Sequence, residues 1–185
     1  PTATPTALGI PVADANGDID SGWLKDASTT VKGIVELATS AEVLAGTDTT
    51  RAVTPDTLTD KILGTVSQSS GSPTGAIIES GSNANGEYVK FADGTMICTG
   101  RSSQSLTAGA PSGAIYFKQM TAPTFPATFI TVTGILASTQ NIAGAVPWIN
   151  PNTYTSSSVN LMFCASASFT DLSVIGRYVA IGRWF

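Results

Sequence analysis

Aromatic and amide side chains gather between residues 137 and 158. Six of them have the chemistry of a sugar-binding site: Gln140, Asn141, Trp148, Asn150, Asn152 and Tyr154. Aromatic faces pack against the C–H groups of sugars, and amides form hydrogen bonds with sugar hydroxyls. Because this stretch has no clear strand pattern, we expect a long loop, and long loops tend to carry function. The alternative is that Trp148 and Tyr154 are core residues of an irregular strand pair. The shorter expected loops at 81–86 and 101–112 are secondary candidates.

Hydrolytic chemistry has few residues to draw on. Glycoside hydrolysis requires two carboxylates on either side of the scissile bond. After residue 75 the chain holds four acidic residues, Glu79, Glu87, Asp93 and Asp171, and Asp93 occupies a predicted turn. The chain contains no histidine, so a Ser-His-Asp triad and an imidazole acid or base are both excluded. We therefore expect that the protein is not an enzyme.

Metal-binding patterns are also incomplete. An alternation of Asp and Asn between residues 14 and 20 lacks the Gly and Glu that a calcium loop needs at its sixth and twelfth positions. Cys98 and Cys164, the two cysteines, cannot form a zinc site without other ligands. We expect them as buried free thiols of a protein assembled under reducing conditions, with a disulfide as the alternative. The sequence predicts neither a metal nor a cofactor.

Composition narrows the possible partners. Charged residues make up 12% of the 185 residues, about half the usual share, so Ser, Thr, Asn and Gly supply much of the polar surface. A polar surface built from such uncharged residues is typical of extended β-rich proteins. The net charge is −4 and basic residues do not cluster, which argues against nucleic acid as a partner. No apolar run is long enough to span a bilayer and no secretion signal is present, so we expect no membrane insertion.

The stretch 27–58 has too few apolar positions to build a core from one copy. Thr39 and Glu42 fit a capping box for a short helix over 41–45, which Gly46 would end. Thr54 and Pro55 predict the start of a second helix. Helices this short are unstable alone in water, so neighbouring chains must cover their apolar side chains. The expected contacts between chains in this stretch are Val31, Ile34, Leu37, Leu44, Val53 and Leu58.

The pattern changes after residues 64–75, which are rich in Gly and Ser and mark a boundary. A hairpin is expected over 87–99, with a turn at Asp93 and Gly94. Further strands are expected at 113–120, 128–137, 158–168, 172–175 and 177–185, and together they favour an antiparallel sandwich. The last strand is apolar on both faces, so it must be covered twice. We expect Trp184 and Phe185 at its end to contact sister chains.

Two sequence words carry a resemblance to a known family. VKGIVELAT at 31–39 and GTDTTRAVTP at 46–55 resemble the repeat of bacteriophage tail fibres and of the fibres of phage-tail-like bacteriocins. The order of NGEYVKF at 85–91, DGTMIC at 93–98, APTFP at 122–126 and AIGRW at 180–184 is similar to the receptor-binding head at the C-terminus of many tail fibres. The family usually opens the hairpin with a Lys-Leu-Pro-x-Gly-Leu wording, where this chain has KFADGT at 90–95.

The resemblance implies a mainly β homotrimer. Its parts would be an intertwined stalk with short helices over 1–66, a linker over 67–75 and a C-terminal antiparallel β-sandwich head over 76–185. The implied function is that of a distal tail-fibre segment of the virion, assembled in the host cytoplasm and joined to upstream fibre segments. Outside the cell it would bind lipopolysaccharide, another bacterial surface glycan or an outer-membrane receptor for host adsorption. The alternatives are a purely structural module that trimerises and closes the tip, and a bacterial extracellular lectin or adhesin.

Overall fold

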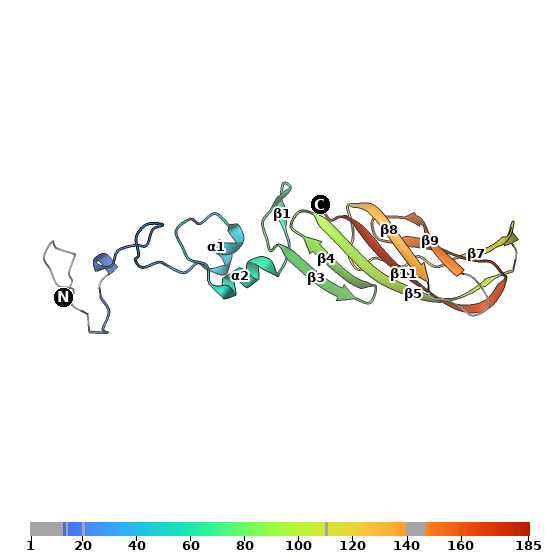
Figure 1. Ribbon diagram of the computed structural model, residues 1–185, viewed down its shortest axis with the longest axis horizontal. Coiled ribbons are helices and arrows are strands. Elements are labelled where there is room, and N and C mark those ends of the chain that lie inside the picture. Colours follow the sequence, from blue (N-terminus) through green and yellow to red (C-terminus); the bar gives the residue numbers. More distant parts are fainter. Residues whose placement is uncertain (1–12, 14, 20, 110, 140–146) are drawn as a thin grey trace. The chain divides into compact units, whose positions relative to one another are not determined.

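The computed structural model describes residues 13, 15–19, 21–109, 111–139 and 147–185 (Figure 1). The chain divides into two compact units, Pro1–Thr59 and Asp60–Phe185, and helix α2 (Pro55–Ile62) spans the division. The sequence placed the end of the stalk at residue 66 and a linker at 67–75. Those linker residues include a small antiparallel hairpin of β1 (Gln68–Ser69) and β2 (Ser72–Pro73).

The first unit is built from short helices and turns. A 3-10 helix, η1 (Ser21–Trp23), precedes α1 (Ser40–Ala45). The backbone N–H of Thr39 donates to Glu42 at 2.9 Å, and the Glu42 N–H donates back to the Thr39 hydroxyl at 3.4 Å. Gly46 ends the helix in the left-handed region with φ of 67°, a conformation that glycine adopts without strain. The predicted capping box and helix end are therefore confirmed.

A turn centred on Arg51 connects the two helices. Its guanidinium forms ion pairs with Glu36 at 3.1 Å, with Glu42 at 3.0 Å and with Asp48. One Asp48 oxygen also accepts the N–H groups of Thr50 at 2.7 Å and of Arg51 at 3.1 Å. The Thr50 N–H and the guanidinium hold the pKa of Asp48 far below its ordinary value. The word at 46–55 thus encodes a hydrogen-bonded turn that leads into the Thr54 hydroxyl, which caps α2.

The first unit has almost no core. Of its described apolar residues only Ala38 is buried, at 7% exposure. Leu37 is 60% exposed, and a hollow of about 720 Å³ is lined by Ile34, Val35 and Arg51 among others. Most of the expected inter-chain contacts are uncovered in the single chain: Ile34, Leu37, Val53 and Leu58 are exposed, and Val31 and Leu44 are half-buried.

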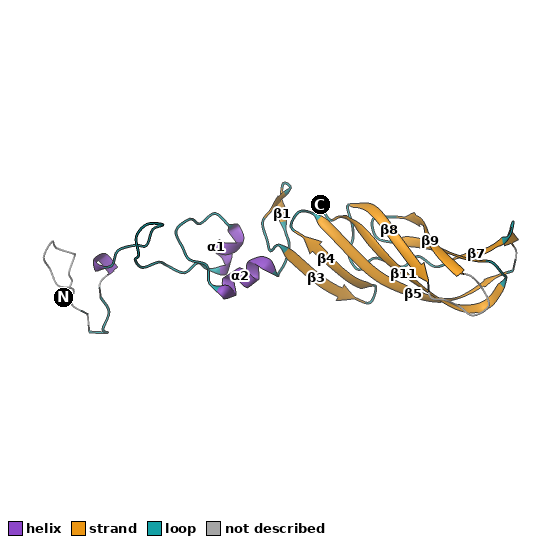
Figure 2. Cartoon of the chain, viewed as in Figure 1, coloured by secondary structure: helices purple, strands orange, loops and turns teal. Residues whose placement is uncertain are grey.

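The second unit is a β-sandwich of two antiparallel sheets (Figure 2). The five-stranded sheet has the order β3 (Ile78–Asn83), β4 (Gly86–Phe91), β5 (Thr95–Ala108), β11 (Phe169–Arg183) and β8 (Thr131–Thr139). The four-stranded sheet has the order β6 (Pro111–Ser112), β7 (Ile115–Gln119), β10 (Val159–Ala165) and β9 (Pro147–Tyr154). The predicted mainly β fold with antiparallel sheets is confirmed.

The core lies between the inner faces of the two sheets. Met96 and Cys98 of β5 and Leu161 and Phe163 of β10 are all fully buried. The two sheets are in close contact at Gly176, where a Cβ would lie 2.9 Å from Ile149 Cδ1. A residue with a side chain at this position would push the sheets apart. The glycine therefore permits close packing in the middle of β11.

Several strand boundaries differ from expectation. Strand β5 continues to Ala108, so most of the expected loop at 101–112 is strand, because small polar residues alternate with the buried Leu106 and Ala108. Strand β3 reaches Asn83, which reduces the expected loop at 81–86 to a tight turn. The two final strands are one, because Gly176 does not interrupt β11. Strand β9 occupies much of the expected loop at 137–158.

Candidate functional site

The outer face of the four-stranded sheet carries aromatic and amide side chains. On β9, Ile149 is in the core, so its neighbours Trp148 and Asn150 point to the opposite face. Directly paired residues of antiparallel strands share a face, and the register extends this set across the sheet. We call the set the aromatic-amide face; its residues are Phe117, Gln119, Trp148, Asn150, Asn160, Met162 and Cys164.

The aromatic-amide face has the chemistry of a sugar platform. Phe117 is 45% exposed, and Trp148 is half-buried. The two rings lie in one row of the sheet, with Cys164 between them. Asn150 and Gln119 are exposed in the next row, on either side of Met162. A shallow hollow of about 570 Å³ is lined by Phe117, Gln119 and Met162 among others. Two rings beside two amides match what a sugar offers, since its C–H groups pack on rings and its hydroxyls bond to amides.

The structure brings together part of the predicted glycan-binding set. Trp148 and Asn150 share the aromatic-amide face. Asn152 is the extra residue of a β-bulge, where the pairing shifts between Asn160 and Leu161. Tyr154 is 57% exposed, but it pairs with the buried Val159 and so projects from the other side of β9. Gln140 and Asn141 lie outside the described residues.

The sequence interpretation missed Phe117, Gln119 and Asn160. All three lie on strands that were expected, at 113–120 and 158–168. Their signal is the alternation in IYFKQ and VNLMFCA, where every second residue faces away from the core. The shared face depends on the register between three strands, which a single sequence does not reveal.

Edge position and hydrogen bonds hold the aromatic-amide face in place. β9 is an edge strand, which explains how it accommodates Pro147 and Pro151. Asn160 donates its side-chain amide to Thr153 at 2.6 Å across the bulge. At the far side, Gln104 accepts the N–H of Thr121 at 2.8 Å and donates to its carbonyl at 3.0 Å. These bonds hold the chain that borders the shallow hollow.

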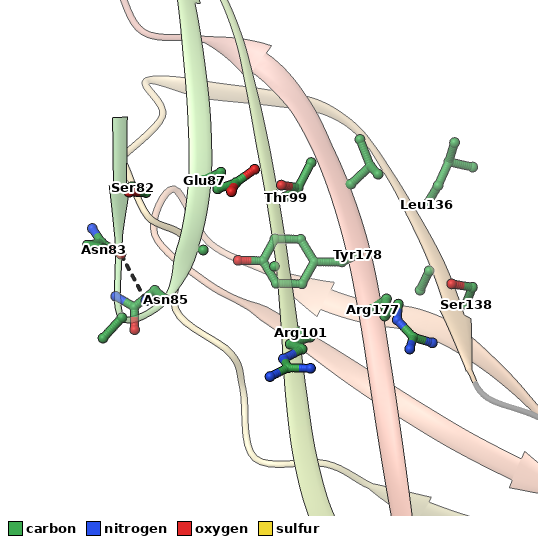
Figure 3. A pocket seen from close by; sticks show the side chains of 15 residues that line it. Ser82, Asn83, Asn85, Glu87, Thr99, Arg101, Leu136, Ser138, Arg177 and Tyr178 are labelled. Carbon is green, nitrogen blue, oxygen red and sulfur yellow. Dashed lines mark hydrogen bonds between the residues drawn. The ribbon is translucent and has the colours of Figure 1, made fainter. Parts of the chain in front are cut away.

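A second hollow, of about 700 Å³, lies over the outer face of the five-stranded sheet (Figure 3). We call it the arginine hollow, because Arg101 of β5 and Arg177 of β11 line it together. The turn between β3 and β4 forms one wall. The Asn83 side chain holds that turn, since it donates to the Pro126 carbonyl at 2.8 Å and accepts the Asn85 N–H at 2.9 Å.

An aliphatic stripe adjoins the arginine hollow on the same sheet face. It consists of Val89, Ile97, Leu136, Val179 and Ile181, which the register places in two neighbouring rows. Leu136 is 73% exposed, and Val179 and Ile181 are exposed as well. On the other side of β11, Tyr178 and Ala180 are buried in the core. Both faces of β11 are therefore apolar, as the sequence predicted. The described residues cover one of the two faces.

The two expected contacts at the end of β11 are engaged within their own chain. The Trp184 indole N–H donates to the Phe91 carbonyl at 2.8 Å, and its ring packs at the edge of the core. Phe185 packs against Trp184 with ring centroids 4.5 Å apart. Both side chains are half-buried. Their described contacts give them a structural role in the second unit.

The partly buried acidic residue Glu79 also has a structural role. It accepts hydrogen bonds from the Val66 N–H at 2.9 Å, from Tyr88 at 3.1 Å and from Lys90 at 3.1 Å. Burial raises the pKa of this carboxyl, but the three donors outweigh burial and lower the pKa below its ordinary value. Its carboxylate is committed to these three bonds, which tie β3 and β4 to the chain before them.

The cysteines are free and buried, as predicted. Burial raises the pKa of both thiols, so neither is an activated nucleophile. Among the described residues, no group of three His, Cys, Asp or Glu side chains is placed to hold a metal ion. Within the same part of the chain, no helix is long and apolar enough to cross a membrane.

Comparison with known proteins yields distant structural neighbours. No family model matches the chain, and no curated protein matches its sequence. The chain is similar to pyocin tail fibres. One is the C-terminal part of the P. aeruginosa R1 pyocin fibre, at 14% identity over 57% of this chain, with a TM-score of 0.40. The other is an N-truncated R1-type pyocin tail fibre, at 17% identity over 58% of this chain, with a TM-score of 0.36.

The coverage of these pyocin fibres differs. The chain spans 28% of the first structure and 88% of the second.

Proposed function

We propose that the chain is the distal part of a tail fibre of a phage or phage-like particle, and that its second unit binds a glycan of the bacterial surface. The observation that carries the proposal is the aromatic-amide face, where Trp148 and Phe117 lie beside exposed amides. The sequence words at 31–39 and 46–55 support the assignment to a fibre. Glycans are the ligand class that fits rings and amides without a charged partner.

We further propose that the fibre is a homotrimer. The first unit buries one described apolar residue, Ala38, while Leu37, Val53 and Leu58 stay exposed. A segment with so little buried apolar surface cannot offset the entropy lost on ordering its backbone. Sister copies that share one core would supply the missing contacts. Three weak glycan sites on one rigid tip would then act together as avidity.

The residues on the face support binding without catalysis. None of the residues that make up the aromatic-amide face is acidic. A glycosidase requires two carboxylates about 5–10 Å apart. The function we propose is therefore attachment at the fibre tip, without cleavage of the glycan.

The test is adsorption of the labelled full chain to a panel of bacterial cells and to lipopolysaccharide purified from each adsorbing strain. We expect Trp148→Ala to lower binding at least about tenfold, as the loss of one packed ring in a trivalent site predicts. Phe117→Ala should lower binding in the same direction. The matched control is Tyr154→Ala, which removes an exposed ring from the opposite side of the same strand. Equal effects of Trp148→Ala and Tyr154→Ala, or none, would contradict the assignment of the face.

A purely structural role is the second candidate, and the aliphatic stripe favours it. In that case the second unit closes the fibre tip and another protein binds the host. The wild-type chain would then adsorb to no strain of the panel, while its trimer would stay intact. Adsorption of the wild type that Trp148→Ala abolishes would exclude this candidate.

A further inference from the structure

Arg101 and Arg177 occupy directly opposite positions on β5 and β11, and neither has an acidic partner among the described residues. They are direct partners in the register of β5 and β11, so their side chains leave the same face of the sheet at neighbouring positions. Both are exposed, and neither belongs to the ion pairs found among the described residues. Like charges at directly opposite positions destabilise a sheet. The two arginines therefore lower the stability of the sheet, and packing does not explain why they are paired.

Basic residues are scarce in this part of the chain, so the pairing of two arginines is unusual. Five Lys and Arg residues follow residue 75. Lys90 is tied to Glu79, and Arg183 stacks over the Phe185 ring at 5.5 Å. Two of the remaining three are placed side by side. An anion between them would relieve their repulsion.

The surroundings of the pair have the size and polarity of a ligand site. Figure 3 shows both arginines at one end of the arginine hollow, with the Asn85 turn on one side and Ser138 of β8 on the other. The volume of about 700 Å³ lies within the usual range of small-molecule sites and far exceeds the volume of one phosphate group. Hydroxyl and amide groups of Asn85, Thr99 and Ser138 also line the hollow, beside the aliphatic Leu136 and Val179. Such groups suit the hydroxyls of a sugar.

Glu87 makes the hollow differ in charge from one part to another. It lines the same hollow from β4, paired with Thr99, and forms no ion pair with either arginine among the described residues. A carboxylate at this position repels an anion and accepts hydrogen bonds from sugar hydroxyls. A ligand with both kinds of group would place its anionic end at the arginines.

We propose that the arginine hollow binds a sugar that carries a phosphate or a carboxylate. The guanidinium groups of Arg101 and Arg177 hold the anionic group by charge-assisted hydrogen bonds, which a planar fork can form in bidentate fashion. Thr99, Asn85 and Ser138 face the sugar ring. The inference deepens the proposed attachment to a surface glycan and rests on it, since it names the class of sugar. The site is separate from the aromatic-amide face, which lies on the other sheet.

The assembled protein is the right object for the test. Leu136 and Val179 belong to the aliphatic stripe and also line the hollow, so a contact between copies would adjoin the site. Titration calorimetry at low salt would compare four probes with the full chain: glucose 1-phosphate, glucuronic acid, glucose and inorganic phosphate. We expect the two charged sugars to bind at least about tenfold more tightly than glucose, as charge-assisted bonds to two guanidinium groups predict.

Variants identify the groups responsible. Arg101→Gln and Arg177→Gln should each lower affinity for glucose 1-phosphate at least about tenfold. Arg183→Gln is the matched control on the same strand and should leave affinity unchanged. Because each Gln variant removes one of two facing like charges, its melting temperature should not fall below that of the wild type. Glu87→Gln should raise affinity for the charged sugars.

Three outcomes would overturn the proposal. Charged sugars could bind no better than glucose, or the Arg183→Gln control could lose as much affinity as the pair. Inorganic phosphate could bind as tightly as glucose 1-phosphate, which would indicate a bare anion site. Trp148→Ala separates this inference from the proposed face: it should leave binding of the charged sugars intact while it lowers adsorption to cells. Failure of the face and failure of the hollow thus give different results.

Discussion

The two units of this chain differ in how their backbone is held. In the first unit, capping bonds at Thr39 and Thr54 and ion pairs around Arg51 shape the turns, but Ala38 is the one described apolar residue that is buried. In the second unit, Phe163, Met96 and their neighbours form a complete core within one chain. Hydrogen bonds and exposed ion pairs specify a conformation, yet each contributes little net stability. The comparison teaches that specific turns and caps can be encoded in a segment that buries almost no apolar side chains of its own, whereas the second unit buries a core within one chain.

Core truncation in the second unit should have the largest effect. Phe163→Ala removes a fully buried ring from β10 and should lower the free energy of unfolding by about 3–5 kcal/mol. Phe117→Ala removes the same ring from the exposed side of β7 and should cost less than about 1 kcal/mol. Guanidinium unfolding followed by near-UV circular dichroism measures both. A similar loss for the two variants would mean that the core is not where the structure places it.

A charge on the first unit should break its association. Leu37→Asp places a carboxylate where Leu37 is 60% exposed in the single chain. If sister copies cover this position, burial of the charge opposes assembly, and the concentration for half-dissociation should rise at least about tenfold. Sedimentation velocity over a dilution series measures it, with Thr47→Asp as a control at an exposed polar position. Identical sedimentation of the Leu37→Asp variant and the wild type would contradict the homotrimer.

Loss of Arg51 should reduce the pH dependence of the first unit. In the wild type the Asp48 and Glu42 pKa values are lowered, so the stability they contribute is present above their ordinary values of 3.8 and 4.5 and is lost as the pH falls. In Arg51→Met the three carboxylates repel one another, and protonation relieves that repulsion. The first melting transition of the variant should therefore fall less than that of the wild type as the pH drops below about 5. The fall that remains comes from the backbone N–H groups of Thr39 and Thr50, which still favour the ionised carboxylates. A parallel response in variant and wild type would show that the ion pairs contribute nothing.

The smallest expected effect concerns Tyr178 in the second unit. Burial raises its pKa from the ordinary value of 10 to about 12. The protonated phenol is favoured in the fold, so stability is complete below pH 10 and falls as the pH rises toward 12. Tyr178→Phe should flatten this fall, at a cost of about 1 kcal/mol near pH 8 for the lost bond to the Thr124 carbonyl. Tyr154→Phe is the exposed control and should retain the fall. If stability fell as steeply at high pH in Tyr178→Phe as in the wild type, groups other than Tyr178 would be responsible for the fall.

Local features of the fold were predictable because they depend on neighbouring residues. The capping box at Thr39, the left-handed Gly46 and the turn after Phe91 each follow from a few adjacent side chains. The long strands were less predictable. Gly176 suggested a break in β11, although the glycine is required there by Ile149 of the other sheet. Pro147 and Pro151 suggested a loop, although an edge strand tolerates both.

The candidate sites were predictable only in part, for the same reason. Trp148 and Asn150 were proposed from their types alone, in a stretch that was expected to be a loop. Phe117 and Gln119 joined them through the register with β10, and Tyr154 left the set because a bulge shifts the strand. Arg101 and Arg177 lie far apart in the sequence, and their pairing arises from the contact between β5 and β11. Long-range register decides which side chains share a face, and neighbouring residues do not encode it.

The central place of β11 between β5 and β8 bears on biosynthesis (Figure 1). Strand β11 is synthesised last, so the larger sheet lacks its central strand until residues 169–183 have left the ribosome. Until then, β5 and β8 each have an edge that is not paired with β11. Such edges attract other chains, and a polysome would hold several nascent copies close together. Premature termination upstream of this strand would leave a product that cannot close its sheet. Proteolytic quality control could therefore remove truncated copies soon after synthesis.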